Sequence, residues 1–205
     1  MKNNQKKRGP SPQKTEKTRA AIVEAARDEF ISFGYSAGKT DRICKNAGVS
    51  RGTLYSYFST KESLFESVLQ EFITAARGEL LAQQRKPDEK IKDFLCRVLI
   101  PVMVTIETSN RAQIARLVIM ESMKFPALAQ AYVREVYLPL LDEFKRLIDL
   151  AIEEGELKND RLARFPQLLL APNWMGMIFN GMLSPSEPMD IAAMFEANIH
   201  LLFDS

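Results

Sequence analysis

The sequence predicts an all-α fold, and three observations support this prediction. Apolar residues recur at steps of three and four residues from Thr18 almost to the C-terminus, which is the spacing that places side chains on one face of a helix. Strict alternation of apolar and polar residues, which is typical of β-strands, occurs nowhere in the sequence. The 205 residues are 46% hydrophobic and 26% charged, with only 9 Gly and 10 Pro, a composition typical of a folded globular protein of one or two domains.

The N-terminal part of the chain is predicted to form a basic arm followed by a helix. Residues 1–17 are rich in Lys, Asn, Gln and Pro and contain almost no apolar residue. Burial of apolar surface cannot offset the entropy of ordering such a segment, so we expect it to be flexible. From Thr18 one helical stripe carries Ile22, Ala25, Ala26, Phe30 and Phe33. Gly34 follows where a left-handed C-terminal cap is needed, and the first helix is expected to end there.

A short helix and a tight turn come next. Ile43, Cys44 and Ala47 share one face of this second helix, and Gly48 ends it. Ser50 is then placed to cap a third helix.

The third helix is predicted to turn Leu54, Tyr57 and Phe58 inward. Ser59 or Thr60 is placed to cap a longer fourth helix. The apolar positions of the fourth helix, at steps of three and four, are Leu64, Phe65, Val68, Leu69, Phe72, Ile73, Ala76 and Leu80.

The remainder of the chain, beyond Pro87, keeps the helical period. We predict helices over residues 88–108, 111–124, 126–154, 161–183 and 188–203. Pro139 and Pro172 fall inside two of these segments. Because proline removes a backbone donor and clashes with the preceding turn, we expect a kink or a break at each.

Charge is distributed unevenly along the chain, although the net charge is only +2. Residues 1–61 contain 13 Lys or Arg and 5 Asp or Glu, whereas the remainder contains 15 and 21. A basic segment of this kind is expected in a protein that binds a polyanion, and a solvated basic tail has the same composition.

The helices on either side of Gly48 and Ser50 have the spacing of a helix-turn-helix. In this motif the N-terminal end of the second helix enters the major groove of DNA. There Arg51 is suited to a bidentate contact with guanine, and Thr53 to a contact with a thymine methyl group or an acceptor. The side chains expected to face phosphates are Tyr55, Tyr57 and Lys61. A helical hairpin with a glycine turn has the same spacing, so spacing alone leaves both interpretations open.

The residues of this region also resemble a known family. The run from Ala47 to Leu64 reads AGVSRGTLYSYFSTKESL, and Ala25-Ala26, Phe30 and Gly34-Tyr35 precede it. This pattern closely resembles the DNA-binding segment of the TetR family of bacterial transcriptional regulators. The resemblance implies a dimeric, all-α repressor whose remaining helices bind a small inducer and pair with a second subunit. It places base contacts at Arg51, Gly52, Thr53 and Tyr55, and phosphate contacts at Tyr57 and Lys61.

The loop before the second helix departs from the family pattern. The family usually has Thr or Ser just ahead of an apolar residue, whereas this chain reads Gly38-Lys39-Thr40. We expect Thr40 to cap the helix one residue late. Lys39 is expected to replace a hydroxyl contact to DNA with a charge contact to phosphate.

These observations predict three regions and a function. The regions are a basic arm over residues 1–17, a helix-turn-helix DNA-binding domain over residues 18–66 and a larger helical domain for ligand binding and dimerisation over residues 67–205. We predict a bacterial transcriptional repressor that binds a palindromic operator on double-stranded DNA as a homodimer and is released by a small apolar effector. Two other hypotheses are a helical protein-interaction module with a basic end and a small-molecule carrier without specific DNA binding.

The last two predicted helices carry more apolar residues than one packed face requires, so we expect a two-fold four-helix interface there. The residues concerned are Leu168, Leu169, Trp174, Met175, Ile178, Phe179, Met182 and Leu183.

An apolar effector pocket is expected in the second domain, because the family resemblance places the effector among helices with bulky, flexible side chains. The candidate lining residues are Phe94, Met103, Ile119, Met123, Phe125, Trp174 and Met177. No Lys or Arg cluster marks a site for an anion, so the ligand is expected to be mainly hydrophobic. Glu121 either contacts this ligand or serves an internal hydrogen bond or the solvent, and Trp174 lines either the pocket or the interface.

The sequence lacks the residue patterns of an enzyme. His200 is the only histidine, so we predict no catalytic residue, no metal and no cofactor. Cys44 and Cys96 lie among helix-forming residues and are expected to be buried and reduced, which fits a cytoplasmic protein. The most apolar stretch, residues 94–106, is too short to span a bilayer, so no membrane association is predicted.

Overall fold

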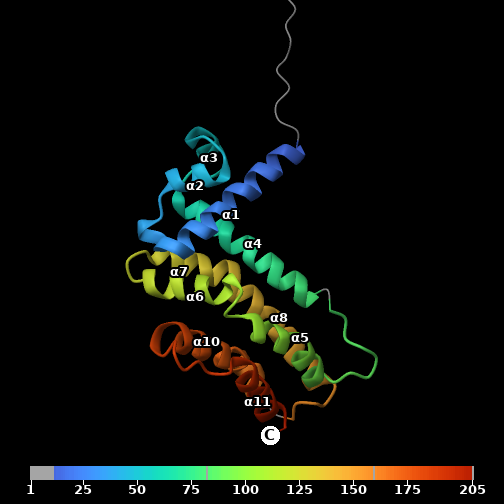
Figure 1. Cartoon of the computed structure of the whole chain (residues 1–205). Coiled ribbons are helices and arrows are strands. Elements are labelled where there is room, and N and C mark those ends of the chain that lie inside the picture. Colours follow the sequence, from blue (N-terminus) through green and yellow to red (C-terminus); the bar gives the residue numbers. More distant parts are fainter. Residues whose placement is uncertain (1–11, 82, 159, 205) are drawn as a thin grey trace, which may run out of the picture. The chain divides into compact units, whose positions relative to one another are not determined.

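The computed structural model is all-helical, as the sequence predicts (Figure 1). It describes residues 12–81, 83–158 and 160–204, without the side chains of residues 72, 73 and 75–81, and no strand occurs in these ranges. The chain forms two compact units whose boundary falls between Val68 and Leu69. We call them the N-terminal unit and the C-terminal unit.

The N-terminal unit begins with α1 (Pro12–Ala37). Residues 12–17, predicted to belong to the flexible arm, are helical, and the rest of that arm lies outside the described residues. Gly34 has φ 77° and ψ 165°, so the helix is interrupted at the predicted position, although not by a left-handed helical cap, and a further helical turn follows to Ala37. Phe33 shares the apolar stripe of α1 but is 52% exposed, and the Arg42 guanidinium lies 4.0 Å from the centroid of its ring.

The turn between α2 (Thr40–Ala47) and α3 (Arg51–Tyr57) agrees with the sequence prediction. Gly48 ends α2 with φ 66° and ψ 32°, a left-handed conformation that glycine adopts at little cost. The Ser50 Oγ caps α3 and accepts a hydrogen bond from the Thr53 N–H at 3.0 Å. Residues Ile43 and Cys44 of α2 are buried, as predicted.

Thr60, rather than Ser59, caps α4 (Lys61–Leu81). The Thr60 Oγ1 accepts from the Ser63 N–H at 3.0 Å, and the Ser63 Oγ accepts from the Thr60 N–H at 3.2 Å. This reciprocal arrangement satisfies two backbone donors at the start of the helix. The apolar positions predicted farther along α4, at Phe72, Ile73, Ala76 and Leu80, lie outside the described side chains.

An aromatic cluster forms the core of the N-terminal unit. Phe30 and Tyr35 of α1 pack with Phe65 of α4, with ring centroids 5.5 to 5.6 Å apart. Leu54 and Phe58 are also buried, as predicted for α3 and the residue after it. The cluster joins the end of α1 to the start of α4.

The C-terminal unit contains the remainder of α4 and the helices that follow it. These are α5 (Ile91–Thr105), α6 (Asn110–Glu121), α7 (Pro126–Tyr132), α8 (Leu138–Glu153), α9 (Arg161–Arg164), α10 (Ala171–Ile178) and α11 (Ile191–Phe203), with the π segments η1 (Val133–Tyr137) and η3 (Phe179–Leu183) and the 3₁₀ segment η2 (Pro166–Leu169). α11 packs against α5 and α10. In the part of the chain that is described, no helix has the length and hydropathy needed to cross a bilayer.

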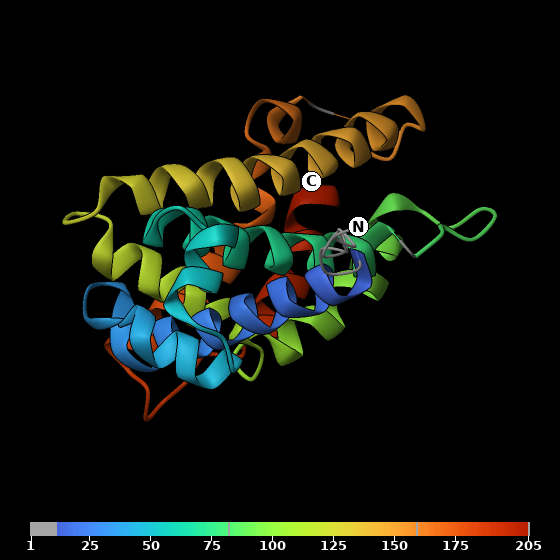
Figure 2. The same ribbon diagram turned by 90° about the horizontal axis from the view of Figure 1, so that it is seen from above.

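Pro139 does not break the helix predicted over residues 126–154. The chain widens into the π segment η1, and the Leu138 N–H donates to the Val133 carbonyl, so Pro139 lies in the first turn of α8 where its missing donor is tolerated. Figure 2 shows α7, η1 and α8 as one continuous rod.

The helix predicted over residues 161–183 is interrupted before Pro172 rather than at it. Phe165 leaves the helical conformation, with φ −132° and ψ 63°, because the following Pro166 disfavours a helical residue before it. Pro172 itself occupies the first turn of α10.

α10 and α11 approach closely at Gly176. A Cβ at this position would overlap the side chain of Ile191 at the start of α11. The buried Asn180 holds the loop before α11, because its Nδ2 donates to the Met189 carbonyl at 3.0 Å and its Oδ1 accepts from the Met189 N–H at 2.7 Å. The position of α11 therefore depends on the absence of a Cβ at Gly176 and on the side-chain amide of Asn180.

Gly176→Ala is expected to lower the free energy of unfolding by about 1–3 kcal/mol, because the added methyl group displaces Ile191. Gly52→Ala is the matched control, since a Cβ there meets only the Ser50 Oγ at 3.8 Å. The control is expected to keep or raise stability by up to about 1 kcal/mol. Chemical denaturation measures both values, and equal stability of the two variants would contradict the close approach.

Candidate nucleic-acid interface and ligand cavity

The start of α2 is held by a carboxylate from another helix. Lys39 is the N-cap residue, and its side chain makes no cap bond. The Lys39 N–H instead donates to Glu29 Oε1 of α1 at 2.7 Å. Thr40, predicted to be the cap, is the first residue of α2. A buried acid therefore satisfies a donor that a local hydroxyl usually serves.

Arg42 completes this network from within α2. Its Nε lies 2.8 and 2.9 Å from the two Glu29 carboxylate oxygens, and its Nη2 donates to the Ala37 carbonyl at 3.2 Å. Burial by itself raises the pKa of Glu29, but the hydrogen bonds from Arg42 and the Lys39 N–H bring that pKa below its ordinary value. The ionised carboxylate ties α1, the loop and α2 together.

Glu29 was missed by the sequence reasoning, although a signal was present. It lies between Ala26 and Phe30 on the apolar stripe of α1, and only 2% of its surface is exposed. A charged residue on a buried face requires a partner, so its position alone indicated a buried ion pair.

The N-terminal part of α3 carries most of the side chains predicted to contact DNA. Arg51, Gly52 and Tyr55 are exposed, whereas Thr53 and Tyr57 are half-buried. Arg51 forms a two-pronged ion pair with Asp41 of α2, and its hydrogen bonds lower the pKa of that carboxyl. An exposed ion pair contributes little stability, so this contact leaves Arg51 able to exchange Asp41 for a base edge.

Lys61, which is predicted to contact phosphate, also makes contacts within the N-terminal unit. Its Nζ donates to the carbonyls of Gly38, at 2.7 Å, and Tyr35, and lies 4.6 Å from the centroid of the Tyr35 ring. Carbonyl groups at the end of a helix lack internal donors, so this ammonium caps the end of α1. Lys39, by contrast, is exposed at the start of α2.

The C-terminal unit contains a cavity of about 450 Å³. Side chains from α5, α6, α7, η1, α8, α10 and α11 form its wall, which is mostly apolar. Its apolar lining includes Val98, Val102, Val136, Phe144, Leu170 and Phe195. The volume lies in the range of small-molecule sites in proteins, roughly 300–1,000 Å³.

Two predicted lining residues, Met103 and Met177, lie in the wall of this cavity. The residues outside the lining are Phe94, Ile119, Met123, Phe125 and Trp174, and also Glu121. Met123 is 92% exposed, and Trp174 instead packs edge-on against Tyr132, which does line the cavity. Helical period identifies a face of a helix, but it does not say whether that face meets a cavity.

The wall of the cavity contains two basic residues, although the sequence shows no Lys or Arg cluster that marks a site for an anion. Arg97 and Arg111 both line the cavity, and none of the described lining residues is acidic. Asn173 Oδ1 is buried with no hydrogen-bond partner among the described residues. Burial raises the pKa of Tyr132, so its phenol stays neutral at physiological pH.

The C-terminal helices expose several apolar side chains. Of the residues predicted to form an interface, Leu168, Met175, Met182 and Leu183 are exposed. Trp174, Ile178 and Phe179 are half-buried, and Leu169 belongs to the core instead. Exposed apolar side chains that gather on one surface typically mark an interaction site.

The cysteines and the histidine lie in unexceptional surroundings. Cys44 and Cys96 are both free thiols, but only Cys44 is fully buried, and Cys96 is half-buried. Burial raises the pKa of both thiols. His200 is exposed, with its Nδ1 3.1 Å from Asp204 Oδ2.

Comparisons with known protein families agree with this geometry. Residues 22–68 match the bacterial regulatory proteins of the tetR family, and residues 95–200 match the C-terminal domain of AefR-like transcriptional repressors. The chain belongs to the TetR family. It is therefore a DNA-binding transcriptional regulator rather than an enzyme, with α2 and α3 as its helix-turn-helix.

Relatives of this TetR-family regulator cover most of its length. The regulator UidR of Escherichia coli K12 is 27% identical over 178 residues, covering 85% of this chain and 84% of UidR. RutR of the same organism is 30% identical over 158 residues, covering 75% of this chain and 69% of RutR. The structure of FadR from Bacillus subtilis in complex with stearoyl-CoA has a TM-score of 0.66 at 20% identity, covering 90% of this chain and 97% of that chain.

Glu29→Gln is expected to lower the free energy of unfolding by about 2 kcal/mol at neutral pH, because a neutral amide bonds less strongly to Arg42 and the Lys39 N–H. Folding lowers the pKa of Glu29, so the contribution of its charge is complete above the unfolded pKa, about 4.3, and is lost as pH falls below it. Denaturation at a series of pH values is expected to show the wild-type advantage shrinking in acid.

The control for this experiment is Glu24→Gln. Glu24 is on the same helix, but its side chain is 68% exposed and pairs only with Arg27 at 3.6 Å. It is expected to change stability by less than about 0.5 kcal/mol. If Glu29→Gln were as mild as this control at neutral pH, the network would not be what holds α2.

Proposed function

We propose that this TetR-family protein is a ligand-responsive repressor, which binds a palindromic operator as a homodimer in the cytoplasm and is released by a small, mainly apolar effector. The observation that carries this proposal is that one chain contains both an exposed helix-turn-helix, with α2 held by Glu29, and a helical unit with a cavity. Membership of the TetR family argues against the two alternatives, a protein-interaction module and a carrier without DNA binding.

The DNA-binding part of the proposal rests on the exposed side chains around the start of α3. Arg51 is the candidate for base recognition, and Gly52, Thr53 and Tyr55 are the other candidate base contacts. Lys39 and Tyr57 are the candidate phosphate contacts. Lys61 is a further candidate, although its ammonium also donates to carbonyls within the N-terminal unit.

The dimer part of the proposal rests on the apolar surface of α10, η3 and α11. Leu201 of α11, 74% exposed, adds to the exposed side chains of Met175 and Leu183. A second copy is the occupant that fits, because a two-fold pair of recognition helices reads a palindrome at half-sites about 34–36 Å apart or a multiple of that spacing.

The effector part of the proposal rests on the cavity of about 450 Å³. A structurally similar protein, FadR, is in complex with an acyl-CoA, which contains a long apolar chain. An effector that prefers the DNA-free conformation lowers DNA affinity, and by linkage DNA lowers effector affinity by the same factor.

Arg51→Ala is expected to lower operator affinity by about 1–3 kcal/mol and to relax sequence preference at one base pair, because a base-specific contact is lost. Operator titration against matched and scrambled duplexes measures both effects. An equal loss on the two duplexes would reject the base-reading role of Arg51.

Lys39→Ala serves as the comparison for Arg51→Ala. A lost phosphate contact weakens binding to every duplex and reduces the slope of log affinity against log salt by about 1. The Lys39 N–H that Glu29 binds is retained in this variant, so α2 keeps its cap. A variant with an unchanged salt slope would remove Lys39 from the phosphate contacts.

Met175→Glu is expected to weaken the homodimer by about 2 kcal/mol or more, because a charge replaces an apolar side chain in the proposed interface. Sedimentation velocity over a range of concentrations measures the change. Met123→Glu is the control, because Met123 is even more exposed but lies at the end of α6. Wild-type protein that sediments as a monomer at micromolar concentration would contradict the dimer.

A further inference from the structure

The charges in the cavity wall carry an inference about the chemical class of the effector. We propose that the effector is an amphipathic carboxylate, with an apolar chain that fills the cavity and a carboxylate group that binds Arg97. This inference rests on the proposed function, because it names the ligand chemistry of the same cavity. It adds an anionic group to the mainly hydrophobic effector that the sequence predicts.

The first observation is the sign of the charge in the wall. Arg97 and Arg111 come from different helices, α5 and α6, and both line the cavity, where no described lining residue is acidic. The remaining wall is mainly aliphatic and aromatic. An apolar cavity with basic and no acidic side chains in its wall is complementary to a molecule with an apolar body and an anionic end.

The second observation is the way in which Arg97 is held. Its Nε and Nη2 donate to the two oxygens of Glu89 at 2.6 and 2.8 Å. Glu89 is itself fixed by the Lys86 N–H at 2.9 Å, and its pKa is lowered to about 2, mainly by the hydrogen bonds from Arg97. Glu89 therefore orients the guanidinium and remains ionised.

The third observation is the weaker contact of Arg97 on its other side. Nη1 donates to Gln83 Oε1 at 3.4 Å, which is a long hydrogen bond to a neutral amide. A carboxylate is a stronger acceptor for a guanidinium than an amide is, so an incoming carboxylate displaces Gln83 from Nη1 while Glu89 keeps Nε.

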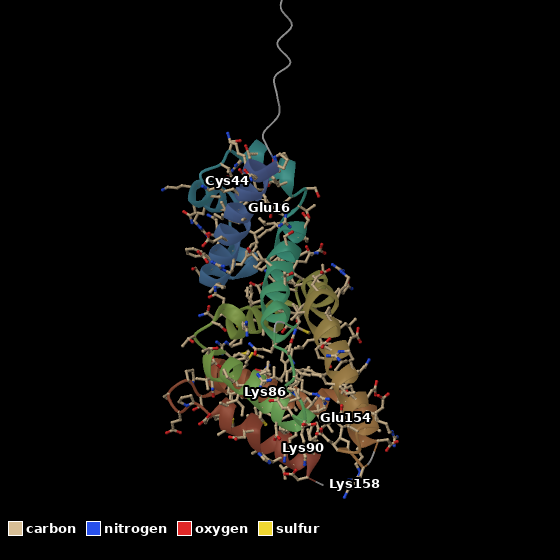
Figure 3. The ribbon with its side chains drawn as sticks, turned by 90° about the vertical axis from the view of Figure 1, so that its right-hand side faces the viewer. Glu16, Cys44, Lys86, Lys90, Glu154 and Lys158 are labelled. Atoms are coloured by element: carbon tan, nitrogen blue, oxygen red, sulfur yellow. The ribbon has the colours of Figure 1, made fainter. Side chains whose placement is uncertain are left out.

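This exchange gives a route from ligand to DNA-binding unit. Gln83, Gln84 and Glu89 belong to the connection between α4 and α5, and Arg97 contacts all three, including the Gln84 carbonyl at 3.1 Å. Figure 3 labels Lys86 and Lys90 in this connection. A ligand that removes Gln83 from Arg97 therefore changes the connection that follows α4, a helix that begins in the N-terminal unit.

The experiment compares two probes of equal chain length, decanoate and 1-decanol, by calorimetric titration of the full-length protein. The wild type is expected to bind decanoate at least 10-fold more tightly than 1-decanol. Arg97→Gln is expected to remove this preference and to leave the affinity for 1-decanol within about 2-fold of wild type. A variant that merely unfolded or collapsed the cavity would lose both probes.

Two further variants keep the test specific. Glu89→Gln removes the carboxylate that orients the Arg97 guanidinium, so its affinity for decanoate is expected to fall about 3-fold or more while its affinity for 1-decanol stays within about 2-fold of wild type. Arg85→Gln is the matched control: Arg85 lies in the same connection and pairs with Glu154 at 2.6 and 2.7 Å, but it does not line the cavity. It is expected to leave both affinities unchanged.

Equal binding of decanoate and 1-decanol by the wild type would overturn the proposal, as would a decanoate preference that survives Arg97→Gln. Operator titration in the presence of each probe separates this failure from failure of the proposed function. If 1-decanol and decanoate released the protein from DNA equally well, the result would support the repressor function and reject a carboxylate as the effector class. If decanoate bound through Arg97 without changing DNA affinity, the carboxylate site would stand and the proposed switch would fall.

Discussion

Carboxylates from distant positions hold the first residues of two helices, and both functional regions depend on this arrangement. α2 and α5 each follow a lysine N-cap, Lys39 and Lys90, whose side chain makes no cap bond. Glu29 accepts from the Lys39 N–H, and Glu156 accepts from the Ile91 N–H at 2.7 Å. The start of a helix has unpaired donors that must be satisfied. Here a remote acid satisfies them and also fixes the helix against a second element.

A remote cap constrains more of the structure than a local hydroxyl does. Ser50 caps α3 from the adjacent residue, and this bond favours the helix without fixing what packs against it. Glu29 caps α2 from α1, so the same hydrogen bond also sets the position of α2, and through Gly48 that of α3. The lysine at the N-cap position is then free to point its charge into solvent. A helix-turn-helix gains from this arrangement because base contacts require a preset geometry.

Local rules predicted most of the fold because most of it is locally determined. Helical period located the major helices, and the roles of Gly48 and Ser50 follow from backbone conformation and side-chain chemistry at single positions. The errors have non-local causes. Phe33 shares the apolar stripe of α1 but is 52% exposed, and its ring packs against a guanidinium from α2 rather than in the core. Pro139 leaves its helix unbroken because a π segment of five residues precedes it, and no propensity rule contains that adjustment.

The candidate site divides in the same way between local and long-range information. Arg51, Gly52 and Tyr55 were placed correctly on the surface because the motif is contiguous in sequence. The carbonyl partners of Lys61 lie 23 and 26 residues earlier in the chain, so no local pattern indicates these contacts.

The cavity was harder still to predict, since its wall draws on helices between α5 and α11 and periodicity does not pair their faces. In a sequence, an arginine with no neighbouring basic residue looks like an ordinary solvated charge. Arg97 becomes informative only when Glu89 is seen to hold it at the cavity wall. A fixed guanidinium loses little entropy when it binds a further acceptor, whereas a free side chain loses much more. The ion pair therefore prepares the arginine for an anionic ligand, as the remote acid at α2 prepares the recognition helix for DNA.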